Sequence, residues 1–223
     1  MLFHSTTLAQ KIFINTSVVI FTIQHNQLHV LMIQRSLEPF INHWILPGGY
    51  IANDESAEET IQRKLFLKTG IKKVFLEQLH VSSDPARDQR GRVINISFLS
   101  IGLHFTTSSF SEYGIVQRHP VKHLPKFIAF DHLEIIKKWY RALSDKLETS
   151  DIAQFFLPNH FTLTELQKVY EIILWYTMDT RNFRAWITRR WLVKQTGKLE
   201  QHVDHRPAKL YRFSSKWYKL KLQ

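Results

Sequence analysis

The sequence predicts an α+β protein of two domains that meet near residue 150. Before that point, β-branched and apolar runs alternate with polar turns and surround a stretch of helical spacing. After it, two helical patterns are followed by two short strand patterns. The boundary divides the chain into an N-terminal domain of residues 1–150 and a C-terminal domain of residues 151–223.

The N-terminal domain is expected to begin with a β-hairpin. Residues 17–23 and 28–33 have the composition of strands, and the polar turn His25-Asn26-Gln27 joins them. Pro47-Gly48-Gly49 is expected to break the strand that follows.

A helix is expected over residues 54–68. Glu58 and Glu59 would place negative charge in its first turns, and Gly70 would end it. Its apolar face would consist of Ala57, Ile61 and Leu65.

Two more strands and a second helix are expected to complete this domain. The strands, at residues 74–81 and 93–105, flank a charged loop at residues 84–92. Residues 131–147 carry apolar side chains at helical spacing.

The C-terminal domain has the order helix, turn, helix and hairpin, which is that of a winged helix-turn-helix. Residues 162–165 supply a cap for the first helix, and Asp179-Thr180 can cap the second. The second helix is expected over about residues 182–194, with Gly197 at its end. Residues 199–213 have the pattern of two short strands joined by a polar turn.

Positive charge is concentrated at the C-terminal end. The chain carries 30 lysine and arginine residues against 19 aspartate and glutamate residues, a formal net charge of +11. Residues 179–223 hold 12 basic residues and only 3 acidic ones, so this segment alone carries +9. A basic balance indicates polyanionic partners, and the interleaved aromatic side chains favour a DNA-binding element over a solvated basic tail.

The composition also excludes several classes of protein. The chain has no cysteine, which rules out disulfides, cysteine-ligated zinc and a thiol nucleophile. No apolar run approaches the ~20 residues that span a bilayer, so no membrane partner is expected. Residues 1–14 lack the pattern of a signal peptide, which favours the cytoplasm.

Residues 49–71 follow the spacing of the Nudix box, G-x5-E-x7-R-E-U-x-E-E-x-G-U, where U is an apolar residue. The matching residues are Gly49, Glu55, Arg63, Leu65 and Gly70-Ile71. The preceding segment WILPGGY, at residues 44–50, also resembles the Nudix superfamily. This resemblance implies an α/β/α sandwich with a mixed sheet.

The metal-binding glutamates of the motif are missing. In Nudix hydrolases, the three glutamates of R-E-U-x-E-E share one helical face and hold the divalent cations that assist diphosphate hydrolysis. Lys64, Leu67 and Lys68 stand at these positions here. Two ammonium groups repel a cation, so we expect no catalytic residues, no metal site and no ordinary hydrolysis. Lys64 and Lys68 lie one turn apart and could face a diphosphate themselves, or be solvated surface lysines.

A second unusual segment is the loop of residues 83–93. Arg87, Arg90 and Arg92 lie within it among turn-forming residues. Their forked guanidinium groups could bind phosphate or ribose, with Asp88 orienting one of them or accepting a hydrogen bond from a sugar hydroxyl. The alternative is an exposed, salt-bridged turn.

The whole chain, from about Ile14 to Phe213, resembles the Nudix-related transcriptional regulators, which are NrtR-like repressors of NAD metabolism. In that family a hydrolase-like domain senses ADP-ribose and a winged helix binds operator DNA. The resemblance is carried by DPARD (84–88), RGRV (90–93), FDH (130–132), FTLTELQKVYE (161–171), NFR (182–184) and RPAKLYRF (206–213). It implies a homodimeric repressor of NAD-metabolism genes that binds double-stranded operator DNA. ADP-ribose or a related nucleotide would be its effector, and no cofactor would be required.

Two sets of site residues are expected. The ligand-binding residues are Arg35, Trp44, Gly48, Gly49, Glu55, Arg63, Lys64, Lys68, Arg87, Asp88, Arg90 and Arg92. The DNA-binding residues are Thr162, Arg181, Asn182, Arg184, Thr188, Arg189, Arg190, Lys194, Arg206, Lys209 and Arg212. Core packing is expected for Trp186 and Trp191, and exposed loops rather than metal sites for His119, His123, His202 and His205.

Two other functions remain open. One is hydrolysis of ADP-ribose or another nucleoside diphosphate derivative by an altered site, which the replaced glutamates disfavour. The other is a regulator of the same family that responds to a sugar-pathway metabolite, although the loop at residues 84–92 favours the ADP-ribose type.

Overall fold

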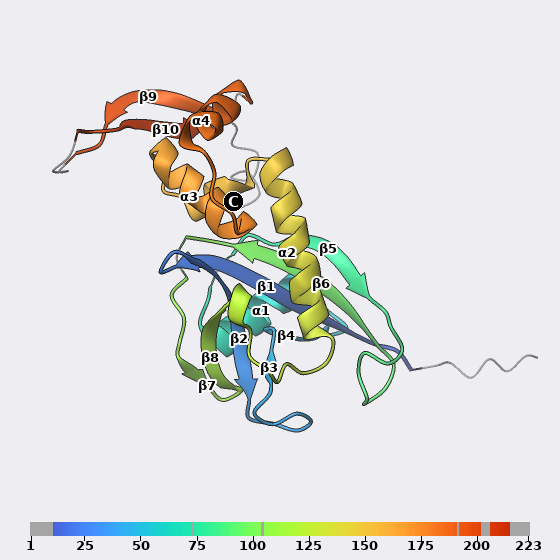
Figure 1. Ribbon diagram of the computed structural model, residues 1–223. Helices are drawn as coiled ribbons and strands as arrows, with labels where there is room; N and C mark the ends of the chain where they lie inside the picture. Colours follow the sequence, from blue (N-terminus) through green and yellow to red (C-terminus); the bar gives the residue numbers. More distant parts are fainter. Residues whose placement is uncertain (1–10, 73, 104, 191, 202–205, 215–223) are drawn as a thin grey trace, which may run out of the picture.

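In the computed structural model, an eight-stranded sheet lies between two helices, and a smaller unit of helices and a β-hairpin is joined to it (Figure 1). The structure describes residues 11–72, 74–103, 105–190, 192–201 and 206–214. The strands of the large sheet are β1 (Phe13–Gln24), β2 (Gln27–Arg35), β3 (Trp44–Ile45), β4 (Gly48–Tyr50), β5 (Glu77–Ser82), β6 (Val93–Ile101), β7 (Phe110–Ser111) and β8 (Gly114–Pro120). Its helices are α1 (Ala57–Thr69), the 3₁₀ turn η1 (Val121–His123) and α2 (His132–Thr149).

The strand order is β5-β6-β1-β2-β8-β7, with β3 paired to β2 and β4 paired to β1. β1 and β6 run parallel while β1 and β2 run antiparallel, so the sheet is mixed. Alternate side chains of β1 point to opposite faces: Val18 and Ile20 pack with α1, and Val19 and Phe21 pack with α2. The two helices therefore cover opposite faces, which confirms the α/β/α sandwich.

The predicted hairpin is confirmed, with longer strands than the sequence indicated. His25 and Asn26 form its turn with φ of 48° and 57°. Two successive positive φ values are those of a type I′ turn, whose twist matches that of the paired strands.

Helix α1 begins at Ala57, three residues later than predicted. Ser56 caps it in a capping box with Glu59, and this cap determines the start. Glu59 thus has the N-terminal role expected of it. Gly70 ends the helix in the left-handed conformation with φ of 79°, as predicted.

Several strand predictions were wrong. The predicted break occurs at Leu46-Pro47, between β3 and β4, but Gly48 and Gly49 belong to β4. A β-carbon on Gly48 would lie 2.1 Å from the carbonyl oxygen of Thr16 on β1. Only glycine allows the two backbones to approach so closely. β5 begins at Glu77 instead of residue 74, and β6 ends at Ile101 instead of residue 105. The sequence patterns did not predict β7 and β8.

The second unit consists of η2 (Ile152–Phe156), α3 (Leu163–Leu174), α4 (Thr180–Arg189), β9 (Val193–Leu199) and β10 (Lys209–Phe213). α3 begins with the predicted capping box of Thr162 and Glu165. The two helices and the antiparallel pair β9–β10 make the winged helix-turn-helix that the sequence predicted.

Helix α4 differs from the prediction at both ends. The carboxylate of Asp179 accepts a hydrogen bond from the backbone N–H of Asn182 at 2.8 Å, so the helix begins at Thr180. It ends at Arg189, and the chain then enters β9. Gly197, expected at the end of the helix, lies inside β9.

One apolar core joins the two units. The residues between α2 and the sheet continue into a cluster with α3 and α4, without a break. Members of this cluster from successive elements are Trp139, Leu143, Leu147, Ile152, Phe156, Leu166, Tyr170, Ile173 and Phe183. The winged helix is therefore packed on the sandwich by the same side chains that form its own core.

Candidate functional site

A cavity of about 240 Å³, the cationic cavity, lies where β1, β4, α1 and the arginine loop at residues 83–92 meet. Eight of the twelve predicted ligand-binding residues line it: Arg35, Gly48, Gly49, Lys64, Lys68, Arg87, Asp88 and Arg90. These come from four separate stretches of the sequence. Five of them are cations, and Asp88 is the only acidic residue among the described residues of its lining.

Lys64 reaches this cavity across the glycine pair of β4. A β-carbon on Gly49 would lie 3.0 Å from Cε and 3.1 Å from Cδ of Lys64. The missing side chain at Gly49 thus leaves room for the aliphatic stem of the lysine. This contact holds the stem of Lys64 against β4, beside the cavity that the residue lines.

Lys68 lies one helical turn further and is half-buried. Desolvation, reinforced by the positive charges of Lys64 and Arg35, lowers the pKa of its ammonium group to about 8. Its Nζ lies 4.9 Å from the ring centre of Tyr113. Burial and the neighbouring positive charges destabilise the charged form of Lys68. An anion bound in the cavity would stabilise that form.

Asp88 orients Arg90, as one of the predicted roles requires. Its carboxylate accepts hydrogen bonds from Nε and Nη2 of Arg90 at 2.9 and 2.7 Å. Burial alone would raise the pKa of Asp88, but the side-chain and backbone hydrogen bonds from Arg90 outweigh it and lower the pKa. The guanidinium group is thereby fixed near the rings of Tyr50 and Phe130, 5.7 and 5.1 Å from their centres.

Arg87 forms a second ion pair, with Asp131 at the start of α2. Its Nε and Nη2 donate to the two carboxylate oxygens at 3.0 and 2.7 Å, and the Arg87 side chain is only 2% exposed. The three arginines of the loop therefore have different surroundings, since Arg92 donates to the carbonyl oxygen of Ser83.

Four predicted ligand-binding residues do not line the cationic cavity. Glu55 and Arg63 bind each other through two hydrogen bonds, and the hydrogen bond from Arg63 lowers the pKa of Glu55 to about 2. Trp44 packs edge-on against His119, with ring centres 4.2 Å apart. Arg92 points its guanidinium group to Ser83 instead. Their side chains are occupied by other contacts, and the spacing of a motif does not reveal this.

The same Trp44 contact corrects the expectation for His119, which lies half-buried on β8 rather than in an exposed loop. His123 is exposed, in η1. The expectations for Trp191, His202 and His205 fall outside the described residues. Trp186 packs against Tyr170 and Phe183, as predicted.

Among the lining residues that were not predicted are Asn15, Thr16, Tyr50, Tyr113, Phe130 and His132. His132 is fully buried, so desolvation lowers its pKa to about 4, and its Nδ1 accepts the backbone N–H of Leu46 at 3.0 Å. Tyr50, Phe130 and His132 stand in the two sequence segments that resemble known families, which was an available signal. Nothing in the sequence marked the others.

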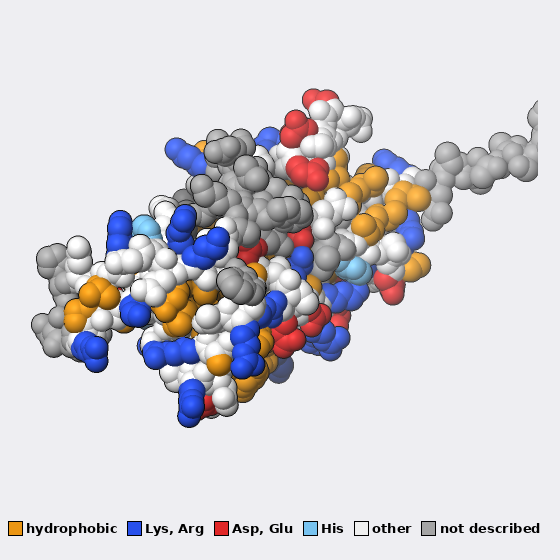
Figure 2. Space-filling view, turned by 90° about the horizontal axis from the view of Figure 1, so that it is seen from above, with side chains coloured by type: hydrophobic (Ala, Val, Ile, Leu, Met, Phe, Trp, Pro, Cys, Tyr) orange, Lys and Arg blue, Asp and Glu red, His pale blue; other side chains and the backbone are white. Residues whose placement is uncertain are grey.

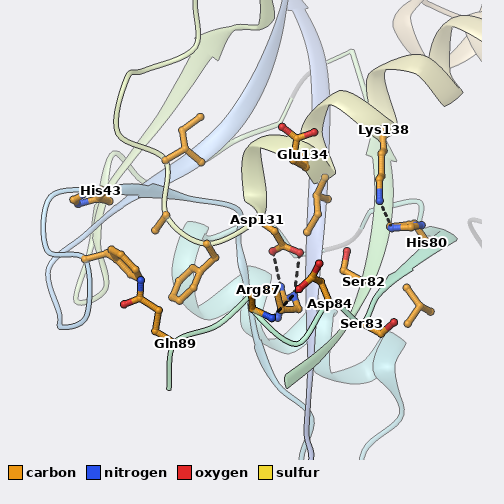
Figure 3. A pocket seen from close by; sticks show the side chains of 17 residues that line it. His43, His80, Ser82, Ser83, Asp84, Arg87, Gln89, Asp131, Glu134 and Lys138 are labelled. Carbon is orange, nitrogen blue, oxygen red and sulfur yellow. Dashed lines mark hydrogen bonds and ion pairs between the residues drawn. The ribbon is translucent and has the colours of Figure 1, made fainter. Parts of the chain in front are cut away.

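A larger cavity of about 810 Å³, the α2 cavity, lies beside the first turns of α2 (Figure 3). Arg87 and Phe130 line both cavities and stand between them. Phe40, in contact with Phe130 at 5.0 Å between ring centres, supplies an aromatic wall. Lys138 and His80 close the other end, with Nζ and Nε2 2.9 Å apart.

The cationic cavity does not fit a divalent metal ion. Mg²⁺ requires oxygen ligands and compensating negative charge, whereas α1 presents Lys64 and Lys68. The single carboxylate, Asp88, is engaged by Arg90. Within the part of the chain that the structure describes, no group of three or more candidate ligand side chains is placed to hold a metal.

The exposed side of α4 is basic and polar. Phe183 and Ile187 are buried, while Arg181, Asn182, Arg184, Thr188 and Arg189 are exposed on the same helix. Figure 2 shows lysine and arginine side chains gathered over this end of the molecule, around the β9–β10 hairpin. This is the distribution that a helix needs to pack on its own domain and contact DNA with its outer side.

The other predicted DNA-binding residues lie in two places, a groove beside α4 and the β9–β10 hairpin. Arg184, Arg206 and Lys209 line one groove between α4 and the hairpin, and Lys194 and Arg212 face each other across β9 and β10. Lys194 therefore belongs to the wing and not to the helix, in contrast to the prediction.

Two residues of the predicted DNA-binding set have internal partners. Thr162 is buried, and its hydroxyl caps α3 by accepting the backbone N–H of Glu165. Arg190 lies over the ring of Trp186 at 4.8 Å. Thr162 also lines the groove that contains Arg184, Arg206 and Lys209, so its predicted DNA contact stays a prediction.

Comparisons with known families match both units. Residues 14–140 match the NUDIX domain, and residues 153–213 match the NrtR DNA-binding winged helix domain. Fold and site thus define a Nudix domain joined to a DNA-binding winged helix. The chain is also 32% identical over 209 residues to the "ADPR responsive transcriptional repressor NtrR" of Acinetobacter baylyi, covering 89% of this chain and 81% of that protein. The chain belongs to the NrtR family.

Two solved structures of Shewanella oneidensis NrtR are similar to this one. The complex with a 27mer DNA has a TM-score of 0.74 and 30% sequence identity, and the match covers 92% of this chain and 95% of that one. The NUDIX domain in complex with ADP ribose has a TM-score of 0.55 and 33% identity, covering 60% of this chain and 90% of that one.

Among the residues that the structure describes, no helix combines the length and the apolar character needed to cross a membrane.

Proposed function

We propose that this protein is an ADP-ribose-responsive transcriptional repressor of NAD-metabolism genes, and that it binds its effector without hydrolysing it. Residues 1–150 would sense the nucleotide, and residues 151–223 would bind operator DNA. The Acinetobacter relative is named for the same response, and the Shewanella relative has been solved with DNA and with ADP ribose.

The observation that carries the proposal is the cation set of the cationic cavity. Lys64, Lys68 and Arg35 converge there with the two arginines of the loop. A diphosphate carries the complementary charge, and guanidinium groups bind its oxygens through paired hydrogen bonds. The ammonium groups stand where a hydrolase of this fold would hold a cation, so they supply the positive charge directly.

The size of the cavities supports a nucleotide rather than inorganic phosphate. At about 240 Å³ the cationic cavity is smaller than most ligand pockets, which enclose about 300–1,000 Å³. The adjoining α2 cavity adds about 810 Å³, an aromatic wall and several polar side chains. A sugar or base attached to the diphosphate would extend past Arg87 and Phe130 into it.

The absence of hydrolysis follows from the same residues. The described lining of the cationic cavity offers no unpaired carboxylate for Mg²⁺, and Glu55, the one remaining glutamate of the motif, is bound by Arg63. The enzyme alternative would need a metal site there, and the only carboxylate in the described lining is Asp88, which is paired with Arg90.

Operator binding would use a homodimer in the cytoplasm. Two copies of α4 related by a two-fold axis would read two half-sites one or more helical turns apart. Size-exclusion chromatography with light scattering, at the concentrations used for DNA binding, measures this directly. A monomer both free and on DNA would contradict the dimer.

A gel shift tests the function. The labelled fragment is the DNA upstream of the protein's own gene neighbourhood, and the titration is repeated with ADP-ribose and with a hexose phosphate. We expect a shift that ADP-ribose weakens and the hexose phosphate does not. No shift at low salt would overturn the repressor assignment, and a response to the sugar phosphate alone would favour the sugar-responsive alternative.

A second assay tests catalysis and the metal. Calorimetry should detect ADP-ribose binding in EDTA with an affinity that magnesium does not improve. Incubation with magnesium should release no AMP. Magnesium-dependent release of AMP at ordinary turnover would establish the hydrolase alternative.

A further inference from the structure

Asp131 occupies an unusual position at the start of α2. It is the N-cap residue of the helix, and aspartate commonly caps a helix by accepting backbone N–H bonds of the first turn. Its carboxylate makes no such bond here. Both oxygens are instead taken by Arg87, at 3.0 and 2.7 Å (Figure 3).

Arg87 connects this helix start to the cationic cavity. Its side chain is nearly fully buried and lines both cavities. Two of the five guanidinium N–H bonds go to Asp131. An anion bound in the cationic cavity would attract the same group, in competition with Asp131.

The backbone next to this pair is held in an uncommon conformation. Phe130, directly before Asp131, has φ of 59°, in the left-handed region that side chains other than glycine rarely adopt. Such conformations persist only where surrounding contacts hold them, and they cluster at ligand sites and switch regions. Phe130 also lines both cavities.

The middle and the C-terminal end of α2 are hydrogen-bonded to α3 of the winged helix. The hydroxyl of Tyr140 donates to the carbonyl oxygen of Ile173 on α3 at 2.7 Å, and the hydroxyl of Tyr170 donates to the carbonyl oxygen of Leu147 on α2 at 2.9 Å. α3 precedes the DNA-facing helix α4 and packs against it through Tyr170 and Phe183. A displacement of α2 would therefore displace the DNA-binding helices.

We propose that the Arg87–Asp131 ion pair is the switch between the effector and the DNA-binding domain. Without effector, Asp131 binds Arg87 and leaves the start of α2 uncapped. Effector phosphate draws Arg87 into the cavity, and Asp131 turns to cap α2. The start of α2 thus has two discrete arrangements, one with Asp131 bound to Arg87 and one with Asp131 capping the helix. The ligand favours the second, as a two-state mechanism requires. This inference rests on the proposed function.

Asp131→Asn is the informative variant. The amide keeps the size of the side chain and its ability to cap, but it lacks the charge that binds Arg87. The variant should bind DNA without effector as weakly as the wild type binds it with ADP-ribose. ADP-ribose should change its DNA affinity by less than about twofold, whereas couplings of this kind typically amount to about 5–150-fold.

The experiment measures affinity for a duplex from upstream of the protein's own gene, with and without ADP-ribose. Calorimetry measures ADP-ribose binding separately, and the variant should bind it at least as tightly as the wild type does, because Arg87 no longer has to leave Asp131. Asp145→Asn is the matched control, because it makes the same substitution at an exposed position of α2 that lines neither cavity. It should respond to ADP-ribose as the wild type does.

Thermal denaturation shows whether Asp131→Asn folds. A second variant keeps the test decisive if it does not. Tyr140→Phe removes only the hydroxyl that joins α2 to α3, and it should also reduce the response to ADP-ribose. An undiminished response in a folded Asp131→Asn protein, or in Tyr140→Phe if the first variant does not fold, would overturn the switch alone. A wild type without any response would overturn the proposed function, and the switch with it.

Discussion

The buried carboxylate of Asp88 holds the guanidinium group of Arg90 through two hydrogen bonds of 2.9 and 2.7 Å, although the two residues are only two positions apart. The Asp88 side chain is 2% exposed, so its charge depends on this partner. Asp88→Asn should lower the free energy of unfolding at pH 7 by about 1.5–3 kcal/mol, the range for hydrogen bonds to charged groups. Urea denaturation measures this, and Asp145→Asn, an exposed carboxylate on α2, should change it by less than about 0.5 kcal/mol.

The pH dependence of the same variant has a defined sign. The pKa of Asp88 is lower in the folded protein than in the unfolded chain. Its stabilising contribution is therefore present above the unfolded pKa, near 3.8, and is lost as the pH falls through the folded pKa. The wild type and Asp88→Asn should converge in stability at acid pH. A difference that persists unchanged at the lowest pH would contradict this explanation.

Effector binding should weaken above about pH 8. The pKa of Lys68 is about 8 in the free protein, and an anion would raise it, so binding takes up a proton at higher pH. The dissociation constant of ADP-ribose should rise by at most tenfold per pH unit above pH 8. Lys68→Met should bind less tightly at pH 7 and lose most of this dependence, while Lys72→Met, at an exposed position, should behave as the wild type.

The same shift in the pKa of Lys68 affects stability in the free protein. Between pH 8 and 10.5 the unfolded chain binds the proton more tightly than the folded protein does. The free energy of unfolding should therefore gain a contribution as the pH rises through this window. Denaturation of the wild type and of Lys68→Met at pH 7 and pH 10 isolates the contribution of Lys68. An equal change in the free energy of unfolding of both proteins would contradict this prediction.

Arg184 is the clearest test of the DNA-facing surface, because it is exposed on α4 and lines a groove with Arg206 and Lys209. Arg184→Ala should weaken binding of duplex DNA by about tenfold. It should also reduce the slope of log K against log salt concentration by about 1, if the contact is to phosphate. Arg141→Ala, which removes an exposed charge from α2, serves as control. Equal losses in both variants would indicate a general charge effect.

Trp175 gives a prediction about the backbone. Its ring stacks on Tyr140 at 4.6 Å, Lys122 lies over it at 5.2 Å, and its φ is 60°. Trp175→Ala should cost about 1–2 kcal/mol through the lost ring contacts. Trp175→Gly should be the more stable of the two by about 1 kcal/mol, because glycine adopts positive φ without strain. Thermal denaturation ranks them, and the opposite order would show that the strain is absent.

Elements with local signals were predictable from the sequence. The cap formed by Thr162 and Glu165 determines where α3 starts, and Gly70 determines where α1 ends. α4 was predicted too long because apolar residues continue past Arg189, through Leu192 and Val193. Those residues pack from β9, and the spacing of a few apolar side chains does not distinguish the two cases. β8 escaped prediction because its alternation is short and mixed with polar residues.

The cationic cavity was predictable in part, for a similar reason. Lys64 and Lys68 could be chosen because the Nudix box defines their positions, and Arg90 because it lies in a loop rich in arginine. Tyr113 and Asn15 enter the cavity only through strand pairings between distant segments. Glu55 and Arg63 fitted the motif, yet they satisfy each other, and this depends on a geometry that spacing alone does not give.

The length of α2 sets the scale of any movement at the DNA. Its 18 residues span about 27 Å at 1.5 Å per residue. One end of the helix lies beside the α2 cavity and the other contacts α3. A rotation of about 5° at the first end would displace the far end by about 2 Å, by the same helical rise. The apolar core around α2 is close-packed, so such a displacement would be transmitted to α3 and α4. A displacement of this size is comparable to the difference in distance between a phosphate contact that is made and one that is broken.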